Sequence, residues 1–328
     1  MYPFGVTVTR QDLEWCLQQA RAQIREPLQG IAGPGSVSWR INREAVVFLG
    51  AGRAALLQLA HPFVAHAVDE HSVTRTDVAG RFRRTFAHVY AMSFGPWERV
   101  AQAARRVHAV HEHVRGTLRE TAGRFRAGDP YEANDERALG WVWGTLVDTA
   151  LLVHERVMGA LPTTERDAYV SEATRFAMLF GLAPGRVPQT YAAFRRWFDD
   201  FAAGDEIAVT ACARRMADFL LTAPSLALRP AAAVLRLVTA GTLPPRLREG
   251  YGLSFGPAER AAFAALWPAL RATYPRLPAR LRHVPAYVEA MRRVRGLPAR
   301  DPFGRAVERA LVGLLERANR TPSVGAPA

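Results

Sequence analysis

Apolar residues recur every three to four positions along most of the chain, which is the period of an amphipathic α-helix. Residues 11–25 follow this period, with polar residues on the opposite face. The same pattern predicts helices over residues 43–49, 53–68, 77–92, 96–113, 134–156, 163–181 and 191–203, followed by shorter helices separated by prolines. Alternating strand patterns are nearly absent. We therefore predict an all-α fold.

Polar caps, glycines and prolines mark where these helices should begin and end. Asn42 and Asn134 are predicted N-caps, because an asparagine side chain accepts a hydrogen bond from the first helical turn. Pro62 should kink or restart a helix, because it has no backbone N–H. Glycines and a proline within residues 123–130 predict a loop.

No Ser/Gly-rich linker divides the chain, so we expect one large domain. Residues 1–40 would form an N-terminal helix and lead-in, and residues 41–225 the core. Residues 226–318 would form a C-terminal helical extension of the same domain, and residues 319–328 a disordered tail.

Cysteine usage and hydropathy limit the class of protein. Cys16 and Cys212 are too few for a disulfide framework or a cysteine-based zinc site. The N-terminus has no basic region followed by an apolar run, and no apolar stretch has the length of a membrane span. We therefore expect a cytoplasmic protein, while a peripheral contact with a membrane stays open.

The formal net charge is +13, and all 43 basic residues are arginine. A basic balance favours anionic partners in general. The arginines are nevertheless scattered through every predicted helix, without a block of five or six like charges. Nucleic acid is therefore not an expected partner, although a basic helical nucleic-acid-binding protein without haem remains an alternative from another class.

Several catalytic motifs are missing from the sequence. There is no Glu-x-x-His pair of a di-iron bundle, no His-Glu-x-x-His, no Gly-x-Ser-x-Gly elbow and no phosphate-binding glycine loop. Hydrolysis by a serine nucleophile and nucleotide-dependent chemistry are therefore not expected.

Seven of the nine histidines lie between His61 and His113. His108 and His111 are three positions apart and so share one helix face. A neutral imidazole on an apolar helix suits haem iron as a ligand. For any one of these histidines alone, the commoner role is a core or surface residue satisfied by hydrogen bonds.

Arg81, Arg84 and Thr85 would share another helix face. Two guanidinium groups and a hydroxyl can hold dioxygen, a carboxylate or haem propionates. Taken alone, the face is more often a solvated basic surface.

Several separated segments together resemble one known family. They are Leu57-Gln58-Leu59-Ala60-His61-Pro62, Glu70-His71-Ser72, Arg81-x-x-Arg84-Thr85, His108-x-x-His111-x-His113-Val114-Arg115-Gly116, Asp129-Pro130-Tyr131 and Trp141-Val142. In this order they resemble the oxygenase superfamily that includes the rubber oxygenases (latex-clearing proteins) and MpaB-type enzymes. The resemblance runs from about residue 43 to residue 201.

The resemblance implies a single helical domain around one b-type haem, with His111 as the ligand to its iron. It places Arg81, Arg84 and Thr85 on the opposite, distal side, as catalytic residues. Where rubber oxygenases have a lysine, this chain has Arg84, which stays protonated and cannot ligate iron. The sixth iron position should therefore be open.

Further site residues are expected from the same resemblance. Cofactor contacts are assigned to His61, Arg115, Trp141 and Trp143, and Glu70 is the candidate acidic catalytic residue. Many members read Trp-Val-His-Ala-Thr-Leu where this chain has Trp141-Val142-Trp143-Gly144-Thr145-Leu146.

The sequence therefore favours a haem b-dependent oxygenase acting on a small apolar substrate with dioxygen, and an electron donor is a further candidate partner. The missing secretion pattern argues against polyisoprene as the substrate. The alternative on the same fold is a non-catalytic haem sensor or carrier.

Overall fold

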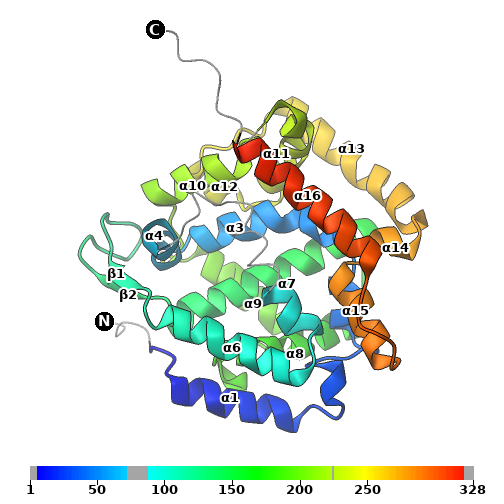
Figure 1. Ribbon diagram of the computed structural model, residues 1–328. Coiled ribbons are helices and arrows are strands. Elements are labelled where there is room, and N and C mark those ends of the chain that lie inside the picture. Colours follow the sequence, from blue (N-terminus) through cyan, green and yellow to red (C-terminus); the bar gives the residue numbers. More distant parts are fainter. Residues whose placement is uncertain (1–5, 72–87, 224, 321–328) are drawn as a thin grey trace.

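The computed structural model describes residues 6–71, 88–223 and 225–320, and it confirms the all-α prediction (Figure 1). The helices are α1 (Arg10–Ala22), α2 (Val37–Asn42), α3 (Ala51–Leu59), α4 (Pro62–His71), α6 (Trp97–His111), α7 (Glu136–Met158), α8 (Thr163–Met178), α9 (Tyr191–Ala203), α10 (Ala211–Leu221), α11 (Arg229–Thr242), α12 (Pro245–Gly250), α13 (Pro257–Thr273), α14 (Ala279–Arg282), α15 (Pro285–Val294) and α16 (Pro302–Arg320). Short 3₁₀ turns include η2 (Ala45–Gly50) and η5 (Leu226–Leu228).

The central element is α7, the green helix that crosses the middle of the molecule in Figure 1. Its 23 residues are buried on nearly every side, including both tryptophans, Trp141 and Trp143. An all-round apolar helix of this kind belongs inside a domain rather than on its surface. It packs against α2, α3, α8, α9 and α13, so it connects the N-terminal, middle and C-terminal parts of the chain.

Capping residues explain where several helices begin. The Asp135 side chain accepts a hydrogen bond from the backbone N–H of Ala138, so Asp135 and not Asn134 caps α7. Asn42 is the last residue of α2 rather than the N-cap of a following helix, so that prediction is wrong. Thr190 caps α9, whose bounds agree with the predicted 191–203.

Pro62 restarts the chain as a new helix, as its missing N–H predicts. The segments Ala45–Leu59 and Pro62–His71 meet at an angle of 102°. This corner directs α4 toward a small hairpin, while His61 lies in the break between the two helices.

The hairpin consists of β1 (Arg115–Thr117) and β2 (Pro130–Glu132), which pair antiparallel with Gly116 opposite Tyr131. The sequence pattern predicts only a loop here, because three-residue strands are too short to show alternation. Both strands lie against α4. Phe63, Leu118, Phe125 and Tyr131 form a small apolar cluster beneath the hairpin.

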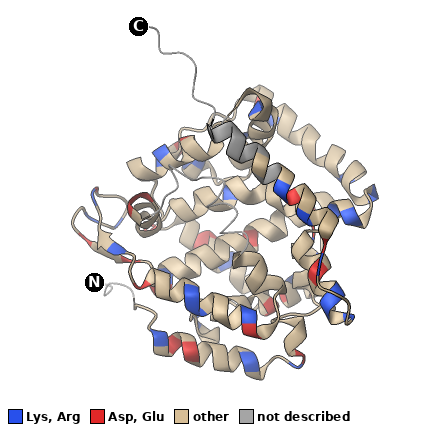
Figure 2. Cartoon of the chain, in the orientation of Figure 1, with Lys and Arg blue, Asp and Glu red and all other residues tan. Residues whose placement is uncertain are grey.

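The C-terminal helices close over the N-terminal part of the core. The Val46 N–H donates to the Tyr274 hydroxyl (3.1 Å), and the Val284 N–H donates to the Arg43 carbonyl (2.9 Å). α16 extends to Arg320, and residues 321–328 of the predicted tail lie outside the described residues. Basic and acidic positions are spread over most helices (Figure 2).

None of the described helices is both long enough and apolar enough to cross a membrane by itself. Two pairs of helical segments would be long and apolar enough if each pair were counted as one, but each pair is sharply bent. They are Ala45–Leu59 with Pro62–His71, and Ala211–Leu221 with Leu226–Thr242.

Candidate functional site

Two of the sequence segments singled out above meet between α4 and the hairpin. The buried Tyr131 hydroxyl of β2 donates a hydrogen bond to Oε2 of Glu70, near the end of α4. Arg119 Nε lies 3.4 Å from the other carboxylate oxygen. Burial and the neighbouring Glu70 carboxylate both raise the pKa of Tyr131, so this phenol stays protonated and remains a donor. Glu70 is therefore held in place as the acceptor of the Tyr131 hydrogen bond.

Gly116 of β1 makes this close approach possible. A Cβ atom at this position would lie 2.8 Å from Glu70 Oε2 and 2.8 Å from the Tyr131 hydroxyl. Any larger residue would have to displace the hydrogen bond, because such distances are well inside van der Waals contact. Gly116 and Tyr131, which belong to two different segments of the family resemblance, therefore both serve the hydrogen bond to Glu70.

His61 lies in an aromatic cage at the corner between α3 and α4. Its ring is fully buried against Phe63, Phe125 and Phe201, and burial lowers its pKa to about 3. Nδ1 accepts a hydrogen bond from the Phe63 N–H at 3.2 Å, so the proton of the neutral ring is on Nε2. Nε2 has no hydrogen-bond partner among the described residues. In this tautomer His61 is a donor and offers no lone pair to a metal.

His111 ends α6 and is partly exposed. Burial of the ring lowers its pKa to about 4, and a hydrogen bond with the Asn134 side chain opposes that shift. The Asn134 side chain thus contacts the ring and orients it. This is the usual arrangement of a metal-binding histidine with its outer hydrogen bond.

The other two histidines of this segment are engaged differently. His108 is buried, with Nε2 3.5 Å from Oε1 of Glu112. His113 is exposed, and its Nδ1 lies 2.8 Å from the Ala109 carbonyl. Of the three, His111 alone combines a partly buried ring with a side-chain hydrogen bond to a neutral residue.

The predicted distal residues Arg81, Arg84 and Thr85 lie outside the described residues. Arg115 is exposed on β1 and faces Glu132 across the hairpin register. Its role as a cofactor contact stays a prediction.

Trp141 and Trp143 are completely buried in the main apolar cluster. The Trp141 indole N–H donates to the Leu57 carbonyl of α3 (2.7 Å), and the Trp143 N–H donates to the Ala173 carbonyl of α8 (2.9 Å). Trp141 stacks on Phe198 and Phe201, with ring centroids 5.2 and 5.0 Å away. Both residues anchor α7 to its neighbours, and their contact with a cofactor stays a prediction.

Comparison with protein families gives one result. The family described as "ER-bound oxygenase mpaB/B'/Rubber oxygenase, catalytic domain" matches residues 39–272. The chain belongs to this family. No match is found among the curated proteins, and none among the solved structures. The matched region holds every predicted site residue and extends past residue 225 into the C-terminal helices.

Membership of the mpaB/rubber oxygenase family makes the Trp143-Gly144 pair informative, because a His-Ala pair is expected there. A Cβ atom on Gly144 would lie 2.4 Å from Cζ3 of Trp197 on α9. Trp143 also packs against Trp197, with ring centroids 5.9 Å apart. Gly144 therefore leaves room for the indole of Trp197, which packs on Trp143. The two residues that depart from the family pattern, Trp143 and Gly144, thus both contact Trp197.

A buried ion pair, which the sequence analysis missed, fixes the neighbouring helices. Arg53 of α3 and Asp148 of α7 are both nearly inaccessible, and their N and O atoms lie 2.6 Å apart. Arg53 also donates to Thr149 (2.6 Å) and to the Thr242 carbonyl (3.0 Å). Asp148 accepts a further hydrogen bond from Arg195 of α9. Buried charges that are paired in this way hold a specific arrangement of helices.

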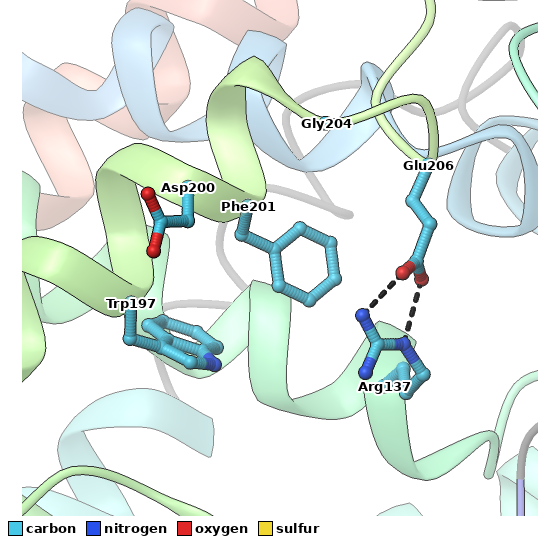
Figure 3. Close-up of a pocket in the computed structure, with 6 residues that line it drawn as sticks. All are labelled: Arg137, Trp197, Asp200, Phe201, Gly204 and Glu206. Atoms are coloured by element: carbon cyan, nitrogen blue, oxygen red, sulfur yellow. Dashed lines mark hydrogen bonds and ion pairs between the residues drawn. The ribbon is translucent and has the colours of Figure 1, made fainter.

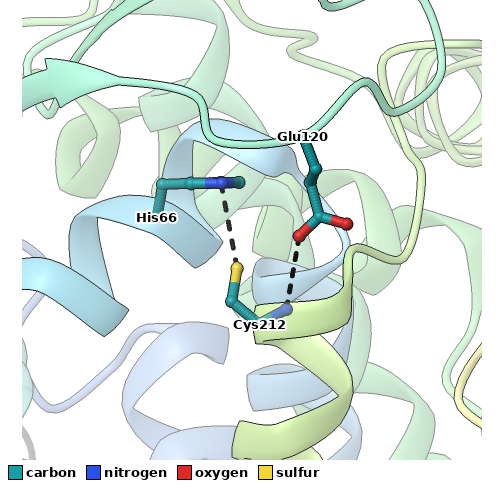
Figure 4. Close-up of side chains that lie close together, drawn as sticks. All are labelled: His66, Glu120 and Cys212. Carbon is teal, nitrogen blue, oxygen red and sulfur yellow. Dashed lines mark hydrogen bonds between the residues drawn. The ribbon is translucent and has the colours of Figure 1, made fainter. Parts of the chain in front are cut away.

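One group of described residues could hold a metal ion by distance. The ligand atoms of His66, Glu120 and Cys212 all lie within 4.8 Å of one another (Figure 4). His66 Nε2 accepts the Arg119 backbone N–H, so Nδ1, which faces Cys212 at 3.8 Å, carries the proton. Glu120 receives the first N–H groups of α10. A metal would have to displace these hydrogen bonds, so the group fits helix capping better.

A pocket of about 240 Å³ opens between α7, α9 and the following loop (Figure 3). It is lined by Arg137, Trp197, Asp200, Phe201, Gly204 and Glu206. The Arg137–Glu206 ion pair forms one wall, with Nε donating to Oε2 at 2.8 Å. Sites for cofactor-sized molecules are usually about 300–1,000 Å³, so this pocket is too small for haem.

Proposed function

We propose that this member of the mpaB/rubber oxygenase family is a haem b-dependent oxygenase that uses dioxygen to oxidise a small apolar substrate. The observation that carries the proposal is the family match, which covers most of the chain and describes an oxygenase catalytic domain. The haem and the substrate class rest on the sequence resemblance and on the chemistry of His111.

His111 fits the role of iron ligand. Its lowered pKa of about 4 keeps the ring neutral at neutral pH, which metal binding requires. Its contact with the Asn134 side chain orients the ring. His61 fits less well, because its free nitrogen carries the proton. His111 would therefore hold the cofactor from the end of α6.

Haem iron, when bound, supplies the activation of dioxygen, and the protein supplies orientation and polarity. Arg81 and Thr85 would supply hydrogen-bond donors for dioxygen. Arg84 stays protonated and contributes positive charge there or to a propionate. All three belong to residues 72–87, which follow α4 directly.

Glu70 would act as the acidic group of the site. Tyr131 and Arg119 hold its carboxylate near the end of α4, immediately before the distal segment. An oriented carboxylate in this position can accept a proton at a free lone pair, or hold a substrate hydroxyl. The buried indoles of Trp141 and Trp143, both on α7, would help to keep water out of the site.

The test is dioxygen consumption by haem-loaded protein, supplied with an electron donor, over a panel of small apolar compounds. Wild-type protein should consume dioxygen with at least one compound, and His111→Ala should lose this activity. His113→Ala is the matched control, since His113 is exposed two residues away, and it should stay active. Loaded protein that binds haem but consumes no dioxygen would favour a sensor or carrier. Activity that survives in His111→Ala would remove the ligand assignment.

A further inference from the structure

The pocket of about 240 Å³ between α7, α9 and the following loop has two aromatic walls (Figure 3). Trp197, Asp200 and Phe201 occupy positions i, i+3 and i+4 of α9, so they share one face of the helix. The Trp197 indole is partly exposed, and its ring centroid lies 5.5 Å from that of Phe201, with 64° between the two planes. Both rings line the pocket, so a flat molecule bound there would pack against aromatic surface.

The indole of Trp197 also brings a hydrogen-bond donor to the pocket. Its N–H makes no hydrogen bond with the part of the chain that the structure describes, whereas those of Trp141 and Trp143 donate to backbone carbonyls. In Figure 3 the indole nitrogen lies on the edge of the ring that is turned toward Arg137. Since a tryptophan N–H is usually paired where it is shielded from water, an oxygen atom of a ligand would complete this site.

The position of this indole depends on Gly144 of α7. A Cβ atom on Gly144 would lie 2.4 Å from Cζ3 and 2.8 Å from Cη2 of Trp197, so an alanine would displace the ring. Alanine is the residue that the family pattern leads us to expect at this position. The indole wall of the pocket thus depends on a residue in which this chain departs from that pattern.

The charges that line the pocket favour neither an anion nor a cation. Glu206 is buried between two guanidinium groups, with Arg137 Nε donating to it at 2.8 Å and Arg124 Nη1 lying 3.2 Å away. Asp200 is exposed and makes no ion pair with the described residues. An anion would therefore meet two carboxylates, and a cation would meet two guanidinium groups. The charged residues next to the lining are likewise of both signs: Arg195, Arg196, Asp199, Asp205 and Arg246, which donates to the Gly204 carbonyl.

We propose that this pocket binds a small, neutral aromatic molecule that carries one hydroxyl group, of which phenol is the simplest example. The ring would lie against Trp197 and Phe201, and the hydroxyl oxygen would accept a hydrogen bond from the Trp197 indole N–H. The volume suits one ring, because a cavity of about 150 Å³ is enough to hold benzene. His111 does not line the pocket, and the inference does not depend on haem or on oxygenase activity.

The experiment is a titration of the full chain, isotope-labelled in its tryptophan indoles and followed by NMR spectroscopy, with phenol, benzoate or benzylamine. These three probes share one ring and differ in charge. The signal absent from Trp197→Phe identifies the Trp197 N–H among the seven indole signals. Phenol should shift this signal with a dissociation constant of about 1 mM, the range expected for a ligand of this size. Benzoate and benzylamine should bind at least about fivefold more weakly, because each would bring an uncompensated charge.

Variants separate the parts of the site. Trp197→Phe keeps a ring but removes the N–H, and it should weaken phenol binding about fivefold in calorimetry. Gly144→Ala keeps the indole but displaces it, and should weaken binding as well. Trp15→Phe is the matched control, because Trp15 is an exposed tryptophan of α1 outside the pocket, and it should bind like wild type. Circular dichroism confirms that each variant is folded.

A saturable shift of the Trp197 signal by phenol, together with weaker binding in Trp197→Phe, would support the proposal. It would be overturned by the absence of a saturable shift, or by shifts of other indole signals alone. Benzoate or benzylamine binding as tightly as phenol would also overturn it, as would unchanged phenol binding in Trp197→Phe.

Discussion

The Tyr131 hydroxyl donates a hydrogen bond to Glu70 across 61 positions of sequence. This bond joins α4 to β2, and it exists because Gly116 leaves room for both side chains. Glu70 adjoins the segment that holds the predicted distal residues. The bond therefore connects the position of a candidate catalytic acid with the hairpin that follows the predicted iron ligand.

Tyr131→Phe should lower the free energy of unfolding by about 1–2 kcal/mol, because it removes the hydroxyl that donates to the Glu70 carboxylate, which is itself partly exposed to water. Urea unfolding measures the change. Tyr287→Phe is the matched control: its hydroxyl receives only a long 3.4 Å contact from Arg43, and the variant should cost less than about 0.5 kcal/mol. Equal losses in the two variants would mean that the Glu70 bond contributes nothing particular.

The packing of Gly144 on Trp197 predicts a coupled pair of mutations. Gly144→Ala should destabilise the wild type by about 1–3 kcal/mol, because the new methyl group enters the space of the indole. In a Trp197→Leu background the same change should be neutral or slightly stabilising, because alanine is the better helix former. Thermal or urea unfolding of the four proteins gives the coupling. Additive effects would show that the two residues do not share this space.

Buried histidines predict acid sensitivity of the fold. Burial lowers the pKa of His61 to about 3 and that of His154 to about 4, whereas both titrate near 6.5 in an unfolded chain. Below about pH 6.5 the unfolded state takes up protons that the folded state refuses, so stability falls as the pH falls toward the folded pKa values. The slope should be about 1.4 kcal/mol per pH unit for each such histidine.

His61→Phe separates this effect from packing. At about pH 8 both states of the wild type hold a neutral ring, so any difference there measures packing alone. Between about pH 6 and pH 5 the variant should lose stability less steeply than the wild type, by the contribution of one histidine. Unfolding curves over this range supply the measurement, and parallel slopes would contradict a neutral buried His61.

Helical periodicity was sufficient to predict the fold class and most of the long helices, because those segments carry a strong apolar stripe or a clear cap. α9 agrees with its predicted bounds, and Pro62 restarts the chain as expected. The hairpin escaped prediction, since three residues per strand carry no readable alternation. The role of Asn42 as a cap was also wrong, because asparagine is common at both ends of helices.

The site could be predicted only in part. The family segments pointed to Glu70 and His111, but the sequence did not reveal their partners Tyr131 and Asn134. Contacts over such separations depend on how α4, α6 and the hairpin pack, which no local pattern encodes. The tautomer of His61 likewise depends on one backbone N–H, that of Phe63.

The most direct test of the central claim is the absorption spectrum of the purified protein, expressed with haem precursor supplied, beside His111→Ala and His113→Ala. Wild type and His113→Ala should show the same Soret band, which sharpens on reduction and shifts with carbon monoxide, while His111→Ala should lose or change it. No Soret band in the wild type after haem is added back, or an unchanged band in His111→Ala, would contradict the account.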